Sequence, residues 1–130
     1  MNNENQTLAE ELAKLAKVEQ IFNQWALPKY NTLLQGGFSE PFYKTFHRNE
    51  IGKLQSAEIQ YRENFLRSAL HEISHWCIAG NERRLMDDFG YWYNEENRSE
   101  SQQNEFYKVE IRPQAIEMGL CEALQIPFII

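Results

Sequence analysis

The segment from Glu63 to Ala79 constrains the fold of this chain more than any other part of the sequence. Its apolar residues recur at helical spacing, and Gly80 follows at the position where helices favour a left-handed residue. At about 100° per residue, the apolar side chains fall within one arc of roughly 140°. They are Phe65, Leu66, Ala69, Leu70, Ile73, Trp76 and Cys77. Because His71 and His75 lie outside this arc, we expect a helix with one core-facing side and two histidines elsewhere.

The two histidines belong to the motif His71-Glu-Ile-Ser-His75, which has the H-E-x-x-H pattern. Imidazoles four residues apart on a helix lie one turn apart and can bind a single metal ion. The alternatives are two surface histidines or two core histidines with backbone partners, and the position of both outside the apolar arc favours the metal site. Glu72 has two candidate roles: general base acting on a metal-bound water, or an outer residue that holds the site in shape.

A metal site of this kind needs a third protein ligand, a carboxylate or an imidazole from further along the chain. Glu110 is the preferred candidate. It lies between Val109 and Ile111, in core-like surroundings where an unpaired carboxylate would be costly. Three other acidic residues compete with it, and each has the alternative role of surface acid or helix cap: Asp87, Asp88 and Glu117.

The N-terminal half of the sequence predicts one more helix and a small sheet. Residues 7–27 begin with capping-box spacing and carry an apolar stripe, so we expect a helix that Pro28 stops. A turn is expected at Gly36-Gly37, followed by strands around residues 42–46 and 57–61.

The C-terminal half is predicted to be mostly helical. A short helical piece at residues 81–87 leads into the aromatic segment Asp88 to Tyr93, which could line a pocket or belong to the core. Residues 101–125 have helical spacing, and Pro113 is expected to kink that helix or to open a second one.

Composition narrows the class of protein. A chain of 130 residues with 42% hydrophobic content can bury one ordinary core, which favours one domain. No apolar run is long enough to span a membrane, and the polar start lacks the features of a signal peptide, so we expect a cytoplasmic protein. The two cysteines, Cys77 and Cys121, lack C-x-x-C spacing and are expected to be reduced, with Cys77 packed in the core.

The charge of the chain bears on its partners. A net charge of −6 argues against direct binding to nucleic acid, which calls for clustered Lys and Arg. Residues 1–70 hold eight basic and eight acidic side chains, whereas residues 71–130 hold five and eleven. The excess of acid in the half that contains the motif suits a cation or a cationic substrate, although a solvated acidic surface would give the same pattern.

The stretch from Ser68 to Gly80 resembles the signature of the elongation factor P hydroxylase family, EpmC. Several further blocks agree in order and spacing: Arg83-Arg84, Asp88-Phe-Gly-Tyr-Trp-Tyr93, Gln102-Gln103, Phe106, Val109-Glu110 and Pro113-Gln114-Ala115. The resemblance is strong over residues 66–128 and weaker over 18–65. It divides the chain into an N-terminal helical extension, 1–17, and a hydroxylase domain, 18–130. Family members continue beyond the point where this chain ends, so we expect a C-terminal part to be missing.

The resemblance implies an α+β fold of the zincin-like metalloprotease type, with H-E-x-x-H on a central helix beside a small sheet. It also implies a non-haem iron monooxygenase that hydroxylates the β-lysylated lysine of elongation factor P. Carried over by position, its metal ligands are His71, His75 and Glu110. Fe(II) is the implied cofactor, with zinc as the alternative ion in purified protein, and O2 is a substrate. The sequence does not specify a further co-substrate.

Two other functions stay open at this point. One is a zinc-dependent hydrolase or peptidase that uses Glu72 as its general base. The other is a non-catalytic, metal-stabilised module that binds a translation factor. Neither nucleic acid nor a membrane is an expected partner in any of the three interpretations.

Overall fold

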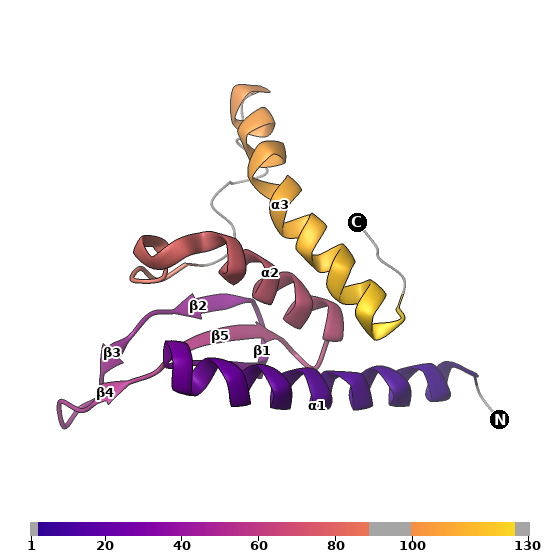
Figure 1. Ribbon diagram of the computed structural model, residues 1–130, viewed down its shortest axis with the longest axis horizontal. Helices are drawn as coiled ribbons and strands as arrows, with labels where there is room; N and C mark the ends of the chain where they lie inside the picture. The colour runs from indigo at the N-terminus through magenta and orange to yellow at the C-terminus, as the bar shows by residue number, and fades with distance from the viewer. Residues whose placement is uncertain (1–2, 89–99, 127–130) are drawn as a thin grey trace.

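The computed structural model describes the backbone of residues 3–88 and 100–126, and the side chains of residues 7–88 and 112–126. Within these residues, the chain forms a long helix, then short strands, then two further helices (Figure 1). The elements are α1 (Asn3–Tyr30), β1 (Thr32–Phe38), β2 (Phe42–Lys44), β3 (His47–Arg48), β4 (Leu54–Gln55), β5 (Ala57–Arg62), α2 (Leu66–Arg83) and α3 (Glu100–Leu124). In the described part of the chain, no helix has the length and apolar character needed to cross a bilayer.

Helix α1 is longer than the sequence predicted. The expectation that Pro28 stops it is wrong, because the helix continues to Tyr30 with the proline inside its last turn. The Tyr30 ring packs edge-on against Trp76 of α2, with 5.2 Å between ring centroids, and this contact stabilises the last two residues of the helix. The helix ends at Asn31, whose φ of 49° is left-handed and whose N–H donates to the Leu27 carbonyl at 3.0 Å.

Strand β5 lies at the centre of a mixed sheet with the order β1-β5-β2. It runs parallel to β1 and antiparallel to β2, while β3 and β4 form a separate hairpin. The predictions of strands near residues 42–46 and 57–61 are confirmed. The turn predicted at Gly36-Gly37 is wrong, since both glycines belong to β1, where the register with β5 is irregular. A Cβ at position 36 would lie 2.4 Å from the Tyr61 ring, so this close approach of strand and ring requires glycine.

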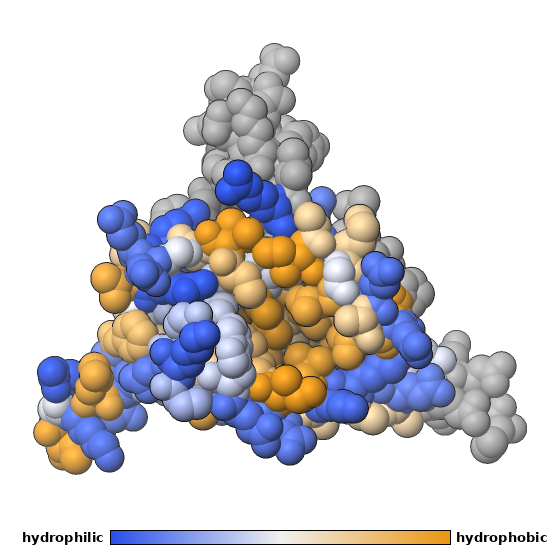
Figure 2. All heavy atoms as spheres, in the orientation of Figure 1, coloured by the Kyte–Doolittle hydropathy of each residue, from blue (hydrophilic) through white to orange (hydrophobic). Residues whose placement is uncertain are grey.

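The core lies between the sheet and the two helices α1 and α2. Leu34 and Ile59, paired across β1 and β5, are buried against helical residues. The helical members of this cluster are Leu15, Phe22, Ala26, Leu66, Ala69, Leu70, Ile73, Trp76 and Cys121. Figure 2 shows apolar residues in the middle of one face of the molecule, with hydrophilic residues around its rim.

At each edge of the three-stranded sheet, one residue forms two hydrogen bonds with another part of the chain. At the β1 edge, the Asn23 amide of α1 accepts from the Leu34 N–H at 2.7 Å and donates to the Leu34 carbonyl at 3.1 Å. At the β2 edge, Tyr43 exchanges two backbone hydrogen bonds with Asp88. An edge strand has no neighbouring strand on one side to pair with its backbone N–H and C=O groups. These hydrogen bonds pair those groups at Leu34 and Tyr43.

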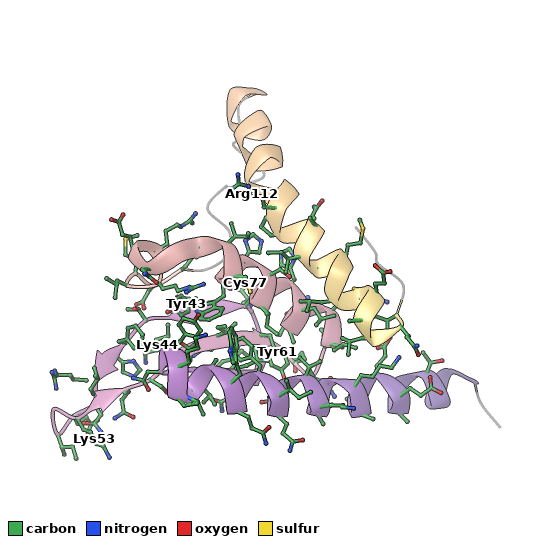
Figure 3. All side chains as sticks on the ribbon, viewed as in Figure 1. Tyr43, Lys44, Lys53, Tyr61, Cys77 and Arg112 are labelled. Atoms are coloured by element: carbon green, nitrogen blue, oxygen red, sulfur yellow. The ribbon has the colours of Figure 1, made fainter. Side chains whose placement is uncertain are left out.

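Helix α2 follows the predicted pattern over most of its length. The helical geometry breaks at Gly80, which has φ 79° and ψ 171°, and a last short turn continues to Arg83. Its buried residues all lie between Leu66 and Trp76. The expectation that Cys77 packs in the core is therefore wrong: Cys77 is exposed, because it lies just beyond the packed part of the helix (Figure 3).

Helix α3 is one continuous element that contains Pro113. Of the two alternatives expected at Pro113, the opening of a second helix is therefore wrong, while the kink stays a prediction. Helix α3 leans across α2 and packs against it (Figure 1). Pro113, Glu117 and Cys121 are buried at intervals of four residues, so they lie on the side of α3 that faces the rest of the protein.

The described residues form one α+β domain, as predicted. The proposed boundary between residues 17 and 18 falls inside α1 and stays a prediction.

Candidate metal centre

The two motif histidines face each other on α2. His71 and His75 are each half-buried, and their Nε2 atoms are 3.2 Å apart. Two imidazole nitrogens that each lie about 2.0–2.1 Å from one ion, at tetrahedral to octahedral angles, are separated by about 2.9–3.4 Å. The observed separation falls in that interval, so the spacing of the two nitrogens is compatible with a shared metal ion.

Glu117 approaches the other nitrogen of the His71 ring. Its Oε1 accepts from the His71 Nδ1–H at 2.8 Å, and its side chain is 8% exposed. A carboxylate on Nδ1 lies on the far side of the ring from Nε2, where a shared ion would bind. The structure therefore places this competitor for the third ligand behind His71, in the position of a hydrogen-bond partner.

Asp87 and Asp88 lie beside β2 and the residue that follows it. The Asp87 carboxylate accepts from the Thr45 N–H at 2.9 Å, and Asp88 pairs with Tyr43 through its backbone. The Asp88 carboxylate is also 3.6 Å from the Arg83 guanidinium. Both acids therefore have a structural role, because these contacts connect the segment after α2 to the sheet.

The preferred third ligand, Glu110, is a residue of α3, seven positions before Glu117. Its side chain is outside those described, so its role as a ligand stays a prediction. Among the described side chains, no third His, Cys, Asp or Glu completes a metal-binding group. Most of the aromatic segment Asp88 to Tyr93 also lies outside the described residues.

A cleft of about 510 Å³ opens beside the site, between the N-terminal part of α1, residues 62–68 and α3. His71 and Glu72 line one part of it, and Glu72 is buried to 9% exposure. Apolar side chains from α1 and the start of α2 form another part of the wall: Leu8, Leu12, Phe65 and Leu66. The cleft thus combines apolar surface with charged groups of both signs: the carboxylates of Glu11, Glu72 and Glu117, and the guanidinium groups of Arg62 and Arg67.

The sequence indicated the paired histidines through their spacing, but it did not indicate the contact between Glu117 and His71. That contact joins residues 46 apart in the chain. A signal was present, because Glu117 lies four residues from both Pro113 and Cys121 on the buried stripe of α3. An acid on a core stripe needs a polar partner, and His71 is the partner it has.

The fold and these contacts define a pair of histidines on one helix, of which His71 lines a cleft and has a buried carboxylate as its hydrogen-bond partner. The sequence comparisons are consistent with this description. The family model for elongation factor P hydroxylase matches residues 21–130, and the chain belongs to this family. The predicted resemblance is thereby confirmed.

One curated relative is the elongation factor P lysine hydroxylase of Haemophilus influenzae (strain ATCC 51907 / DSM 11121 / KW20 / Rd). It is 44% identical over 110 residues, which cover 85% of this chain and 60% of the relative. The chain therefore spans about 60% of the length of the curated relative that it matches.

Proposed function

We propose that this chain contains the metal-binding part of an enzyme that hydroxylates a lysine side chain of elongation factor P. Membership of the family supports the proposal, as does a relative named as an elongation factor P lysine hydroxylase. The observation that carries it is the pair of Nε2 atoms, 3.2 Å apart, on a helix that borders a cleft. The lysine in this proposal already bears a β-lysyl group, as the family resemblance implies.

The proposed cofactor is Fe(II), held by His71, His75 and Glu110. Two imidazoles and one carboxylate form the ligand set of non-haem iron oxygenases, and zinc would compete for the same set. The bound iron would supply the activation of O2 that hydroxylation needs. The zincin-like fold belongs to the same proposal, because α2 lies beside a mixed sheet whose antiparallel strand β2 is at the edge.

The described residues suggest how the substrate would be held. A β-lysyl-lysine side chain is long and aliphatic and carries two ammonium groups. The apolar wall of the cleft, with Leu12 and Phe65, suits the methylene groups, while the carboxylates of Glu11 and Glu72 suit the ammonium groups. Both carboxylates line the same cleft as His71. The reacting carbon would then lie near His71.

The test is a labelling experiment with β-lysylated elongation factor P, Fe(II), a reductant that supplies the two electrons for the second oxygen atom, and this chain, with the Haemophilus relative as positive control. The proposal predicts a mass gain of one oxygen atom on the modified lysine, with the label derived from labelled O2. If the relative is active and this chain transfers no oxygen despite full metal occupancy, the proposal fails for this chain. Label derived from water would also contradict it.

A further inference from the structure

The buried contact behind His71 identifies a residue that acts on the metal site without touching the metal. We propose that Glu117 is a positioning residue, which fixes the ring orientation and the tautomer of His71 so that the Nε2 lone pair is directed toward the metal position. The inference rests on the proposed function, because it assumes that His71 binds a metal ion.

The tautomer follows from the chemistry of the two groups in contact. An ionised carboxylate can only accept hydrogen bonds, so the His71 nitrogen that faces Glu117 at 2.8 Å must carry the proton. In a neutral imidazole, the other nitrogen is then an acceptor. The His75 Nε2 lies 3.2 Å from that acceptor, within hydrogen-bond distance. With a proton on His75 Nε2, the hydrogen bonds run in one direction, from His75 to His71 to Glu117.

The surroundings of Glu117 keep its carboxylate in place. Pro113 and Cys121, one turn on either side of it in α3, are both fully buried. The Glu117 side chain, 8% exposed, has little freedom to turn toward solvent. A buried carboxylate is expensive to desolvate, and a leucine of similar size would pack at that position with less penalty. Packing alone therefore does not explain an acid here, whereas positioning the ring of a metal ligand does.

The experiment compares Glu117→Leu and Glu117→Met, which both remove the acceptor, with Glu117→Gln, whose amide oxygen can still accept from Nδ1–H. Glu122→Leu is the matched control, since Glu122 lies on the same helix but is exposed. Two properties are measured: the His71 tautomer, by long-range ¹H–¹⁵N NMR of the protein prepared without metal, and the affinity for Zn²⁺ alone, by competition with a chelator. Neither measurement requires active enzyme.

We expect the Nδ1–H tautomer for His71 in the wild type. Glu117→Leu should lose this preference and bind Zn²⁺ about 10- to 100-fold more weakly, Glu117→Gln should recover most of the affinity, and Glu122→Leu should match the wild type. An Nε2–H tautomer in the wild type would overturn the inference. So would a folded Glu117→Leu variant with an affinity within about twofold of the wild type.

The two proposals fail in different ways. If the wild type binds no Zn²⁺, the metal site of the proposed function is wrong, while the tautomer in the metal-free protein still tests the contact with Glu117. If Glu117→Leu does not fold, the wild-type tautomer and the Zn²⁺ affinity of Glu117→Met decide the inference: the Nδ1–H form with weakened binding supports it, and the Nε2–H form or an unchanged affinity overturns it.

Discussion

Replacing Arg84 by alanine should destabilise the protein by about 2–3 kcal/mol, because its guanidinium binds the Trp76 carbonyl near the end of the regular part of α2. Its Nε and Nη2 donate to the Trp76 carbonyl at 3.1 and 2.7 Å, and its plane lies over the Trp76 ring with 3.8 Å between Cζ and the ring centroid. Hydrogen bonds from a charged donor contribute about 1.5–3 kcal/mol, and a partly exposed cation–π contact about 0.5–1 kcal/mol. Since Arg84 is half-buried, we take the lower part of the combined range.

For a chain of this length, such a loss corresponds to a fall in melting temperature of roughly 6–12 °C. Thermal unfolding followed by circular dichroism measures it. Arg84→Lys should lose about half as much, because an ammonium cannot reproduce the planar two-donor contact. Arg83→Ala is the control: the Arg83 side chain is 47% exposed and its ion pair with Asp88 is 3.6 Å long, so its effect should be near zero. Equal shifts for the two alanine variants would refute the reasoning.

Three further predictions concern other described contacts. Asn23→Leu should destabilise by about 2–4 kcal/mol, because it leaves the buried N–H and carbonyl of Leu34 unpaired; chemical denaturation measures this, and a loss below about 0.5 kcal/mol would contradict it. The pKa of Tyr61, which lies between the sheet and α1 (Figure 3), is raised by burial and by the Glu19 carboxylate that accepts from its hydroxyl. Folding favours the neutral phenol, so stability should be complete below the ordinary pKa of about 10 and decline above it, and melting curves should show a smaller alkaline decline for Tyr61→Phe. Glu72→Gln should keep substantial O2-dependent hydroxylation, whereas a hydrolase using Glu72 as base would lose about 10² to 10⁴-fold in rate.

The elements that sequence reasoning predicted correctly are those whose local pattern agrees with their final packing. Helix α2 is the clearest example, because its apolar arc from Leu66 to Trp76 is the surface that it buries. The prediction failed at Cys77, because the apolar periodicity of α2 continues to this residue whereas the buried part of the helix ends at Trp76. It also failed at Pro28, where a contact between Tyr30 and Trp76 extends the helix past a residue that usually stops one.

Strand β1 was missed because its glycines were interpreted through local preferences alone. Gly36 is needed for the approach of the Tyr61 ring, a residue 25 positions later that no local signal connects to it. The same limit applies at the site. The spacing of His71 and His75 predicted that they would meet, whereas the contact with Glu117 depends on how α3 crosses α2, which periodicity does not determine.

The central claim is that His71 and His75 bind one metal ion together, and metal stoichiometry tests it most directly. The chain has three histidines, so His47→Ala, at β3, is a matched control for His71→Ala and His75→Ala. After loading with Fe(II) under anaerobic conditions, the wild type and His47→Ala should hold one ion per chain. His71→Ala and His75→Ala should lose it while their helical circular dichroism is retained. Full occupancy in either of these two variants would contradict the account.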